Sequence, residues 1–471
     1  MNIDEVCAKA KRQLTPSTKE RQIIERTAEQ IRQRVDDECK KSKLEADVRL
    51  EGSVAKDTWI PGYVDIDIFM LVSPELSKDQ LNTVCLPIAR KALQGNRIIE
   101  RYAEHPYVEA FIQTQKDLRV NVVPCYKIER GNWLSATDRT PFHAQYVNEH
   151  LTPDERGDVR LLKAFLRSIG TYGADIKTGG FSGMLVETLT IGFEGFLDVI
   201  RNFAEWTPSR YSDIEHYYQD RTDEVRKIFP EPLIVIDPVD KGRNLGAAVR
   251  PDQLWNLVAA SRHFLKRPTT RFFREPRIKP LTKIEYQKLT RDRGSDLLVI
   301  SFGQIEAVVD VLWSQLFRTQ RAIANFLANN DFEIVKSAAW SDEKKLNILI
   351  YELESLQIPG SKKHLGPPVS RSSESASFIQ KHSGNKNTIA GPWIEDQRWV
   401  VEKRRTQTNA QQLICSAIER RSEIGLASLF TKARPRIKVL NQTTITPMIS
   451  SNFAFSKFMR NFLDGRPVWY A

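Results

Sequence analysis

The spacing of one glycine-serine pair and two aspartates constrains this chain more than any other feature. Gly52-Ser53 is followed, after eleven intervening residues, by Asp65-Ile66-Asp67, which opens an increasingly apolar run to Val72. On a β-strand, residues i and i+2 point to the same side, so both carboxylates share one face of the predicted strand. Facing carboxylates repel one another unless a cation lies between them. Mg²⁺, which takes oxygen ligands, is the natural candidate.

Such a carboxylate pair is suited to phosphoryl transfer. Two divalent ions a few ångström apart can support an in-line displacement at phosphorus. Gly52 would let the backbone approach a triphosphate, and the Ser53 hydroxyl with nearby N–H groups could hold the phosphates at a helix N-terminus. Alternating acids also occur on solvent-facing strand edges, so this spacing by itself leaves a purely structural role open.

The segments around this motif predict a small α/β domain over about residues 1–138. Apolar residues at helical spacing and the sequence Thr15-Pro16-Ser17 predict a helix that begins near residue 17. We further expect a short helix at 54–58, a helix at 79–94, and strands at 65–72, 107–113 and 118–123.

The remaining sequence predicts an α+β protein of several domains, and 471 residues are enough for about three of them. Residues 154–204 follow a helical period interrupted by glycine clusters, and a strand from 234 runs into a polar turn before a helix at 252–265. Strand, helix, strand and strand are predicted at 297–302, 309–329, 332–338 and 345–353, which is most of a ferredoxin-like unit. Pro, Gly and Ser dominate residues 357–376, which are expected to form a loop.

Positive charge is concentrated in two segments. The net charge is +11, and residues 261–293 and 401–471 each carry a local +8. Solvated surfaces would account for single runs of charge. Here, however, the cations alternate with aromatic residues: Phe264, Phe272, Phe273, Phe453, Phe455 and Phe458. Phosphates need cations and unpaired bases need flat apolar surfaces, so this combination favours a nucleic-acid partner.

The composition excludes several other classes of protein. Five scattered cysteines, an odd number without a CxxC pair, fit neither a disulfide framework nor a cysteine zinc site. No apolar run approaches 18 residues, and the N-terminus lacks the pattern of a secretory signal. We therefore expect a protein without a membrane span, located in a reducing cytoplasm.

Several further motifs occur in an order and spacing that resemble one known family. They are Val120-Asn121-Val122-Val123-Pro124-Cys125-Tyr126, Asp138-Arg139-Thr140-Pro141-Phe142-His143, Arg160-Leu161-Leu162-Lys163, Tyr172-Gly173-Ala174, Gly180-Phe181-Ser182-Gly183 and Asp237-Pro238-Val239-Asp240-Lys241-Gly242-Arg243-Asn244. Together with residues 50–69, they resemble the archaeal-type, class I CCA-adding tRNA nucleotidyltransferases of the polymerase-β-like superfamily. The resemblance is clear over about residues 1–350 and looser beyond.

The resemblance implies a template-independent polymerase that restores the 3′-terminal CCA of tRNA from CTP and ATP by two-metal chemistry with Mg²⁺. The implied partners are the tRNA acceptor stem and 3′ end, with no membrane and with a homodimer as one option. The implied α+β organisation has a catalytic head (1–138), a mainly helical nucleotide-binding neck (139–270), a ferredoxin-like body (271–356 with 385–405) and a basic RNA-binding tail (406–471).

The resemblance also assigns roles to individual residues. Asp65, Asp67 and the residue at position 121 would bind the metals. The triphosphate or sugar would be held by Gly52, Ser53, Lys56, Thr140, His143, Lys163 and Tyr172, and Arg243 would help to read the base. Four of these residues have structural alternatives: His143 as a satisfied loop histidine, Lys163 as a surface cation opposite Asp158 or Asp154, Tyr172 as a turn-packing aromatic, and Arg243 as a turn residue paired with Asp240.

The chain departs from the family at Asn121, where a third metal-binding carboxylate is normal. An amide oxygen can still bind Mg²⁺, but it adds no negative charge and cannot help to draw a proton from the primer hydroxyl. Three explanations stay open: an exchange introduced to trap a complex, a natural branch with reduced or different activity, or compensation by another acid. Asp117 shares the strand face, but four strand residues span roughly 13 Å, which is too far for direct replacement.

Asn121 is thus expected to limit catalysis rather than folding, and Asn121→Asp would then raise the rate of CMP and AMP addition. The favoured function is that of a CCA-adding nucleotidyltransferase, or of a copy weakened or inactivated by Asn121. A non-polymerising tRNA- or nucleotide-binding homologue, and a related nucleotidyltransferase that makes other additions, remain the alternatives.

Overall fold

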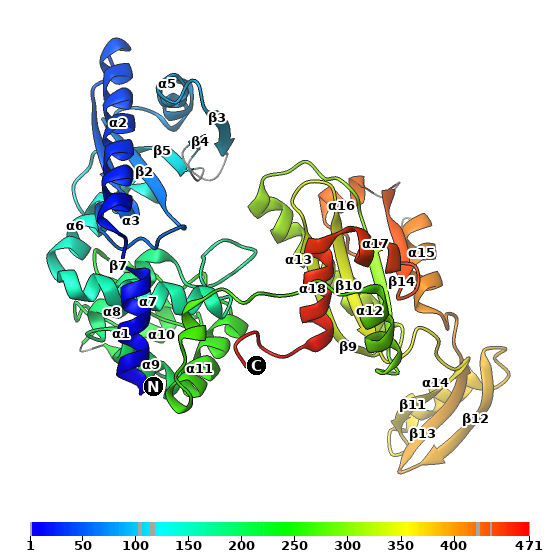
Figure 1. Ribbon diagram of the computed structural model, residues 1–471. Helices are drawn as coiled ribbons and strands as arrows, with labels where there is room; N and C mark the ends of the chain where they lie inside the picture. Colours follow the sequence, from blue (N-terminus) through cyan, green and yellow to red (C-terminus); the bar gives the residue numbers. More distant parts are fainter. Residues whose placement is uncertain are drawn as a thin grey trace. The chain divides into compact units, whose positions relative to one another are not determined.

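The structure is a computed structural model and describes residues 2–101, 106–113, 118–219, 221–420, 424–433 and 436–470. Asp117 lies outside these residues. The chain forms two compact units, Met1–Arg277 with Arg466–Ala471, and Ile278–Gly465. They are called unit 1 and unit 2 below, and Figure 1 shows their elements.

A five-stranded sheet forms the first part of unit 1. Its strands are β1 (Ala46–Glu51), β2 (Asp65–Val72), β3 (Arg97–Arg101), β4 (Tyr107–Ile112) and β5 (Leu118–Tyr126), in the order β1-β2-β5-β4-β3. The β2–β5 pair is parallel and the other pairs are antiparallel. The strands expected at 65–72, 107–113 and 118–123 are confirmed.

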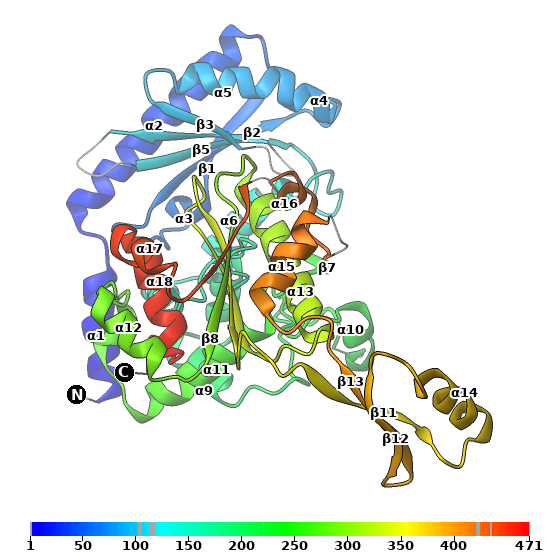
Figure 2. The same cartoon turned by 90° about the vertical axis from the view of Figure 1, so that its right-hand side faces the viewer.

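Two helices cover one face of this sheet, α2 (Thr18–Lys41) and α5 (Leu86–Ala92), the latter preceded by α4 (Lys78–Gln80) and a π-helical turn at Leu81–Cys85. Figure 2 shows α2 and α5 on the same side. Their apolar side chains form one core with Ile66, Ile68, Val120 and Val122. Because side chains alternate along a strand, Asp65, Asp67 and Asn121 point to the opposite face. Ser17 caps α2 as a capping box, which explains its predicted start.

The rest of unit 1 is mainly helical. It comprises α1 (Ile3–Leu14), α3 (Gly52–Ala55), α6 (Thr140–His150), α7 (Pro153–Ser168), α8 (Gly183–Gly192), α9 (Phe196–Ala204), α10 (Thr222–Ile228), α11 (Pro251–Lys266) and the hairpin of β6 (Ile236–Asp237) and β7 (Asp240–Asn244). The polar turn expected after residue 236 was wrong in part, because Asp240–Asn244 pairs back as a strand.

The aromatic residues of the first basic segment belong to the core of unit 1. Phe264, Phe272 and Phe273 are buried and pack around Phe165 of α7. The expectation that they offer stacking surfaces for bases was therefore wrong, because these phenylalanines lie on the inner face of α11 and of the turn after it, while the cations between them point outward.

Unit 2 contains a sheet of β8 (Asp296–Ser301), β9 (Ile334–Ser341), β10 (Asn347–Leu353) and β14 (Lys438–Asn441) in the order β14-β8-β10-β9. Helix α13 (Val309–Asn329) lies between β8 and β9 in sequence, as expected for the ferredoxin-like unit. The sequence after residue 406 supplies β14 and the helices α15 (Ala410–Glu419), α16 (Ser428–Lys432), α17 (Thr446–Ser451) and α18 (Phe453–Asp464). These helices pack with α12 (Lys283–Arg291) and α13 into the cores on this sheet, and Phe455 is fully buried there.

A separate three-stranded sheet lies within the sequence of unit 2. It consists of β11 (Ser361–Pro368), β12 (Thr388–Glu395) and β13 (Arg398–Arg404) in the order β11-β13-β12, with helix α14 (Ser372–His382) against it. The loop expected at 357–376 was wrong. Pro367 and Pro368 end the edge strand β11, where a missing N–H is tolerated. A Cβ at Gly366 would come within 2.6 Å of the Phe378 ring, so this glycine serves helix packing.

Among the described residues, the helices include none that is both long and apolar enough to span a membrane.

Candidate active site

Strands β2 and β5 bring three of the expected metal-site residues together. In their parallel pairing, Asp65 is opposite Arg119 and Asp67 is opposite Asn121. The Asn121 amide donates a hydrogen bond from Nδ2 to Asp67 Oδ1 at 2.8 Å. Arg119 donates from Nε to Asp65 Oδ1 at 2.7 Å, and its Nη2 contacts the other Asp65 oxygen. The residue beside Asp65 is thus a cation, which reasoning from the sequence had not considered.

Burial of the Asp67 carboxyl raises its pKa to about 6. The hydrogen bond from Asn121 acts in the opposite direction, toward a lower pKa. The other amide atom, Asn121 Oδ1, is buried without a hydrogen-bond partner. An oxygen acceptor left without a donor away from water is costly, and a cation would satisfy it.

Gly52 brings the main chain against Asp67. Its φ is +69°, which favours glycine, and a Cβ here would lie 2.1 Å from Asp67 Oδ2. Any side chain at this position would therefore occupy the space of the carboxylate. Ser53 follows in the short helix α3, and its carbonyl accepts a hydrogen bond from the Thr58 amide at 3.0 Å.

The donor set of Asp65, Asp67 and Asn121 Oδ1 fits a hard divalent cation, because all the available ligand atoms are oxygens and one of them is unsatisfied. In the part of the chain that the structure describes, no group of three or more His, Cys, Asp and Glu side chains is arranged as a metal site. Strands β2 and β5 therefore contribute two carboxylates and one amide at this position.

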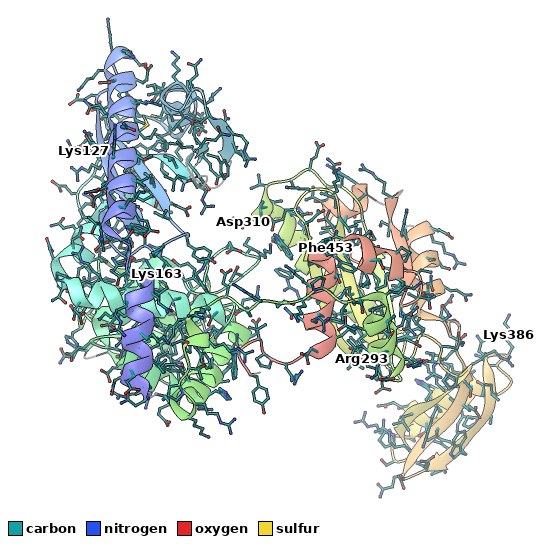
Figure 3. The ribbon with its side chains drawn as sticks, in the orientation of Figure 1. Lys127, Lys163, Arg293, Asp310, Lys386 and Phe453 are labelled. Atoms are coloured by element: carbon teal, nitrogen blue, oxygen red, sulfur yellow. The ribbon has the colours of Figure 1, made fainter. Side chains whose placement is uncertain are left out.

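Lys56 and Lys163 meet at a buried carboxylate that the sequence analysis missed, Glu187 of α8. Lys163 Nζ donates to Glu187 Oε1 at 3.0 Å, Lys56 contacts Oε2, and the Thr58 hydroxyl donates to Oε1 at 2.6 Å. Figure 3 labels Lys163 on α7. A single acid within the otherwise uncharged helix Gly183–Gly192 was the available signal.

The alternative of Lys163 as a surface cation was wrong. Its side chain is 4% exposed, and Asp154 and Asp158 instead pair with Lys11. Burial would raise the pKa of Glu187, but the ammonium groups of Lys163 and Lys56 lower it to about 2. Glu187 is thus a buried anion balanced by two cations.

One face of α7 holds the loop that follows α3. Arg156 donates to the Lys56 carbonyl at 3.0 Å, Arg160 to the Trp59 carbonyl at 3.1 Å, and Lys163 to the Thr58 carbonyl at 3.1 Å. Residues spaced by four and three along a helix lie on one face. These three cations therefore position residues 56–59 beside the Gly52 turn.

The Glu187 cluster predicts an acid-dependent loss of stability. The pKa of Glu187 is about 2 in the folded chain and about 4.5 when unfolded, so this group stabilises the fold fully above pH 4.5. That stabilisation is lost as the pH falls from 4.5 toward 2. In thermal melts from pH 6 to pH 3.5, the wild-type melting temperature should fall more steeply than that of Glu187→Gln. Parallel curves would contradict the assignment.

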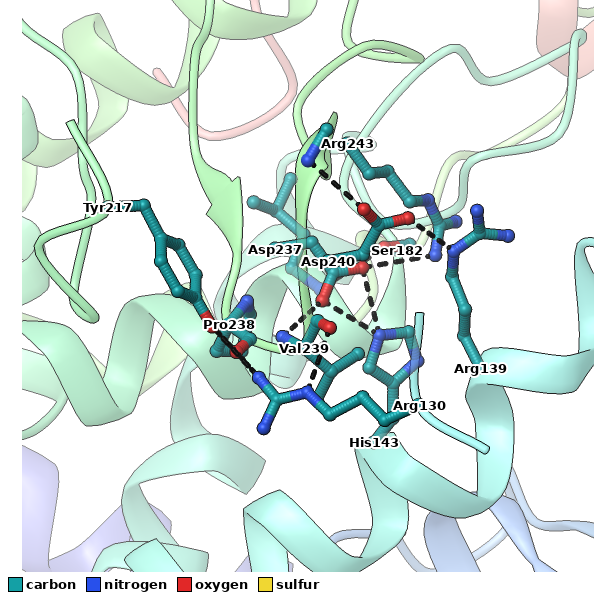
Figure 4. A network of polar contacts seen from close by, with 12 residues as sticks. Arg130, Arg139, His143, Ser182, Tyr217, Asp237, Pro238, Val239, Asp240 and Arg243 are labelled. Atoms are coloured by element: carbon teal, nitrogen blue, oxygen red, sulfur yellow. Dashed lines mark hydrogen bonds and ion pairs between the residues drawn. The ribbon is translucent and has the colours of Figure 1, made fainter. Parts of the chain in front are cut away.

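A second polar network surrounds Asp237 (Figure 4). His143 Nε2 lies 2.9 and 3.0 Å from the two Asp237 oxygens, and Arg243 Nη1 lies 3.2 Å from Oδ2. Burial acts to raise the pKa of Asp237, but His143, the Val239 amide and Arg243 bring it below its ordinary value. Asp237 therefore orients both His143 and Arg243.

Two structural alternatives from the sequence are resolved by this network. His143 is indeed buried and has a partner, on helix α6 rather than in a loop. Arg243 does not pair with Asp240, because Arg139 Nε occupies Asp240 Oδ2 at 2.8 Å. The Arg243 side chain keeps 42% of its surface exposed, so its far end is accessible.

Thr140 and Tyr172 are the two remaining residues expected to bind the nucleotide, and they lie on α6 and between α7 and α8, respectively. Thr140 is the first residue of α6, directly before Pro141. Tyr172 forms a β-bridge with Phe181, and burial raises its pKa to about 12. A Cβ at Gly183 would lie 3.5 Å from the Tyr172 hydroxyl, so the ring lies against the start of α8.

Only some residues of the basic segments are exposed for a partner. Arg293 donates to the Leu463 carbonyl in the last turn of α18, and Arg460 donates to the Lys279 carbonyl at 2.7 Å and to Glu285. Exposed cations remain in each unit: Lys266, Arg267 and Arg277 in unit 1, and Lys283, Lys288 and Arg291 in unit 2. Phe453, labelled with Arg293 in Figure 3, is 72% exposed.

Three family models match the chain in succession. They are described as nucleotidyltransferase domain (residues 29–147), tRNA nucleotidyltransferase, second domain (157–274), and CCA-adding enzyme, C-terminal domain (293–427).

Curated proteins similar to this chain include a CCA-adding enzyme of Methanopyrus kandleri, 35% identical over 78% of both chains. A CCA-adding enzyme of Haloarcula marismortui is 31% identical over 98% of this chain and 99% of its own. Two solved structures similar to this chain share less of its sequence. A cytoplasmic RNA terminal U-transferase has a TM-score of 0.44 at 13% identity, covering 59% of this chain and 99% of its own. CdnC of E. coli MS115-1 has a TM-score of 0.43 at 14% identity, covering 58% and 95%.

Proposed function

The chain belongs to the family of CCA-adding enzymes, and from that membership we propose that it builds or repairs the 3′ CCA end of tRNA, using CTP and ATP. The observation that carries this proposal is similarity over essentially the whole length of a CCA-adding enzyme, 98% of this chain and 99% of the relative. The aspartate pair of β2 and the glycine that packs against it supply a matching site.

Asp65, Asp67 and the Asn121 amide oxygen would hold divalent ions, and we propose Mg²⁺. Bound there, the metal would supply charge stabilisation to the transferring phosphoryl group and would lower the pKa of the primer hydroxyl. Asp65 and Asp67 provide the negative charge of this donor set, and Asn121 fixes one Asp67 oxygen through its amide hydrogen.

The nucleotide would be held by residues around these carboxylates. The Gly52-Ser53 main chain would lie against the triphosphate, because no side chain intervenes at Gly52. Lys56 and Lys163, together with Glu187, carry a net charge of +1, which attracts phosphate. Thr140, His143 and Tyr172 would contact the phosphates or the sugar, and the exposed end of Arg243 would face the base.

A transfer assay separates this proposal from a non-polymerising binding protein. The full chain is incubated with radiolabelled CTP and ATP, tRNA that lacks CCA, and Mg²⁺. We expect incorporation of both nucleotides, its loss on chelation of the metal, and little incorporation of UTP or GTP. Binding of tRNA without any incorporation would favour the binding homologue. Incorporation of UTP or GTP in preference would favour a nucleotidyltransferase of another specificity.

Binding of tRNA should depend strongly on salt. The exposed cations of the basic segments would contact phosphates, and release of counterions makes such binding weaken as salt rises. For about six phosphate contacts, the affinity should fall by about 10³-fold between 50 and 200 mM salt. Filter binding at four salt concentrations measures this slope. A flat slope, or equal affinity for duplex DNA, would contradict the phosphate-based account.

A further inference from the structure

The strand register places four polar residues in one row across the sheet of unit 1. Glu51 is opposite Asp67, Asp67 is opposite Asn121, and Asn121 is opposite Glu109 of β4. Residues paired across neighbouring strands point to the same face of a sheet. Glu109 therefore adjoins Asn121 on the side away from Asp67.

Glu109 shares a cation with Asp65. The Arg119 guanidinium, which binds Asp65 through Nε at 2.7 Å, also places Nη1 3.8 Å from Glu109 Oε2. Glu109 is only 2% exposed, so its carboxylate is not solvated as that of a surface acid would be. Carboxylates from two strands thus lie around one positive group.

The same row contains oxygen atoms without partners. Asn121 Oδ1 is buried and makes no hydrogen bond, and neither does Glu51 Oε2, on a side chain that is 4% exposed. Glu51 lies beside Asp67, on the far side from the amide. Unsatisfied oxygens flanking an aspartate indicate a place prepared for a cation.

We propose that Glu109 supplies the third carboxylate of the metal site and compensates for the amide at position 121. The inference rests on the proposed function and selects one of the three explanations for Asn121, compensation by another acid. Neighbouring strands lie about 4.8 Å apart, and a glutamate is one methylene longer than an aspartate, so its carboxylate can lean over the Asn121 position. In this structure Arg119 lies between Asp65 and Glu109, so these carboxylates are not yet arranged around a common point. A divalent ion would displace the Arg119 guanidinium and draw them together.

The test compares Glu109→Gln, Asn121→Asp and the double variant in the full chain. Glu100→Gln is the matched control, because Glu100 is opposite Val108, points to the other face of the sheet and pairs with Arg90 at 2.9 Å. The readouts are the rate of CMP addition, the affinity for Mn²⁺ measured without nucleotide or tRNA, and the melting temperature.

Glu109→Gln should lower the rate by about 10²-fold and weaken Mn²⁺ binding by about tenfold, comparable to the loss of a group that tunes a metal site. Asn121→Asp should raise the rate far less in the wild-type chain than in the Glu109→Gln background, because in the wild type the third charge is already present. In the double variant, Asn121→Asp should restore both the rate and the Mn²⁺ affinity, which recovery of a merely structural contact would not do.

Unchanged Mn²⁺ affinity and rate in Glu109→Gln would overturn the inference, as would a large gain of rate in Asn121→Asp. A double variant as impaired as Glu109→Gln would also overturn it, whatever its melting temperature. The two proposals fail separately. Suppose that the wild-type chain adds no nucleotide, but Glu109→Gln still weakens Mn²⁺ binding and Asn121→Asp restores it. The proposed function would then be wrong, and the role of Glu109 in the metal site would still be supported.

Discussion

Replacing Asp67 by alanine should lower nucleotide transfer by at least about 10³-fold while tRNA binding stays within about threefold of the wild type. Asp67 is the carboxylate that both Gly52 and Asn121 contact, so its removal takes charge from the centre of the proposed metal site. The exposed cations that are proposed to bind tRNA lie at other positions in the chain and are not altered by this substitution. Single-turnover addition of CMP measures the first effect, and filter binding measures the second.

The control for this experiment is Asp79→Ala, an exposed acid in α4 of the same unit, which should keep the wild-type rate. Asp67→Asn, which keeps the shape of the side chain, should lose activity without a loss of melting temperature. If Asp67→Asn transferred nucleotides at the wild-type rate in Mg²⁺, the carboxylates of β2 would not be the catalytic centre.

Glu187→Gln should destabilise unit 1 by about 3–5 kcal/mol, the cost typical of breaking a buried ion pair by removal of one partner. Glu187 receives Lys56, Lys163 and the Thr58 hydroxyl, and none of these groups has solvent to replace the lost charge. Denaturant unfolding at pH 7 measures the effect. A loss below about 1 kcal/mol would contradict the buried cluster.

Two further variants test whether this loss of stability arises from the Glu187 ion-pair cluster. Glu149→Gln, which changes an exposed glutamate on α6, should cost less than about 0.5 kcal/mol. The triple variant Lys56→Met, Lys163→Met and Glu187→Leu should be more stable than Glu187→Gln, because it leaves no unpaired buried charge. Its nucleotide transfer should nevertheless fall, since the positive potential beside Gly52 is gone.

Strand β2, which carries the proposed catalytic aspartates, could be predicted from the sequence because its pattern is local. The same-face position of Asp65 and Asp67 follows from the two-residue period of a strand, and the apolar run after them predicts burial. The position of Asn121 beside Asp67 depends on which strands pair, and the motif resemblance supplied it in advance of the register.

The partners of these residues could not be predicted, because they come from distant parts of the chain. Glu187 lies 131 residues from Lys56, and Asp237 lies 94 residues from His143. Single acids in apolar surroundings were visible in the sequence, but nothing local indicated which cations they would meet. Arg119 was likewise hidden, because only the parallel register places it against Asp65.

The incorrect expectations share a cause, since composition does not distinguish a surface from a core. Phe455 is spaced among basic residues like a base-stacking aromatic, yet it is fully buried on the sheet of unit 2, whereas Phe453 two residues earlier is 72% exposed. Residues 361–368 have the composition of a loop but form an edge strand through backbone pairing with β13. In both cases, contacts with residues distant in sequence determine the structure.

The most direct test of the central claim is the length and sequence of the product formed on three forms of one tRNA, lacking CCA, CA or only the terminal A. With CTP, ATP and Mg²⁺ present, the account predicts extension by three, two and one nucleotides, each product ending in CCA and not being extended further. Extension beyond CCA, addition of other nucleotides, or no extension of any of the three would contradict it.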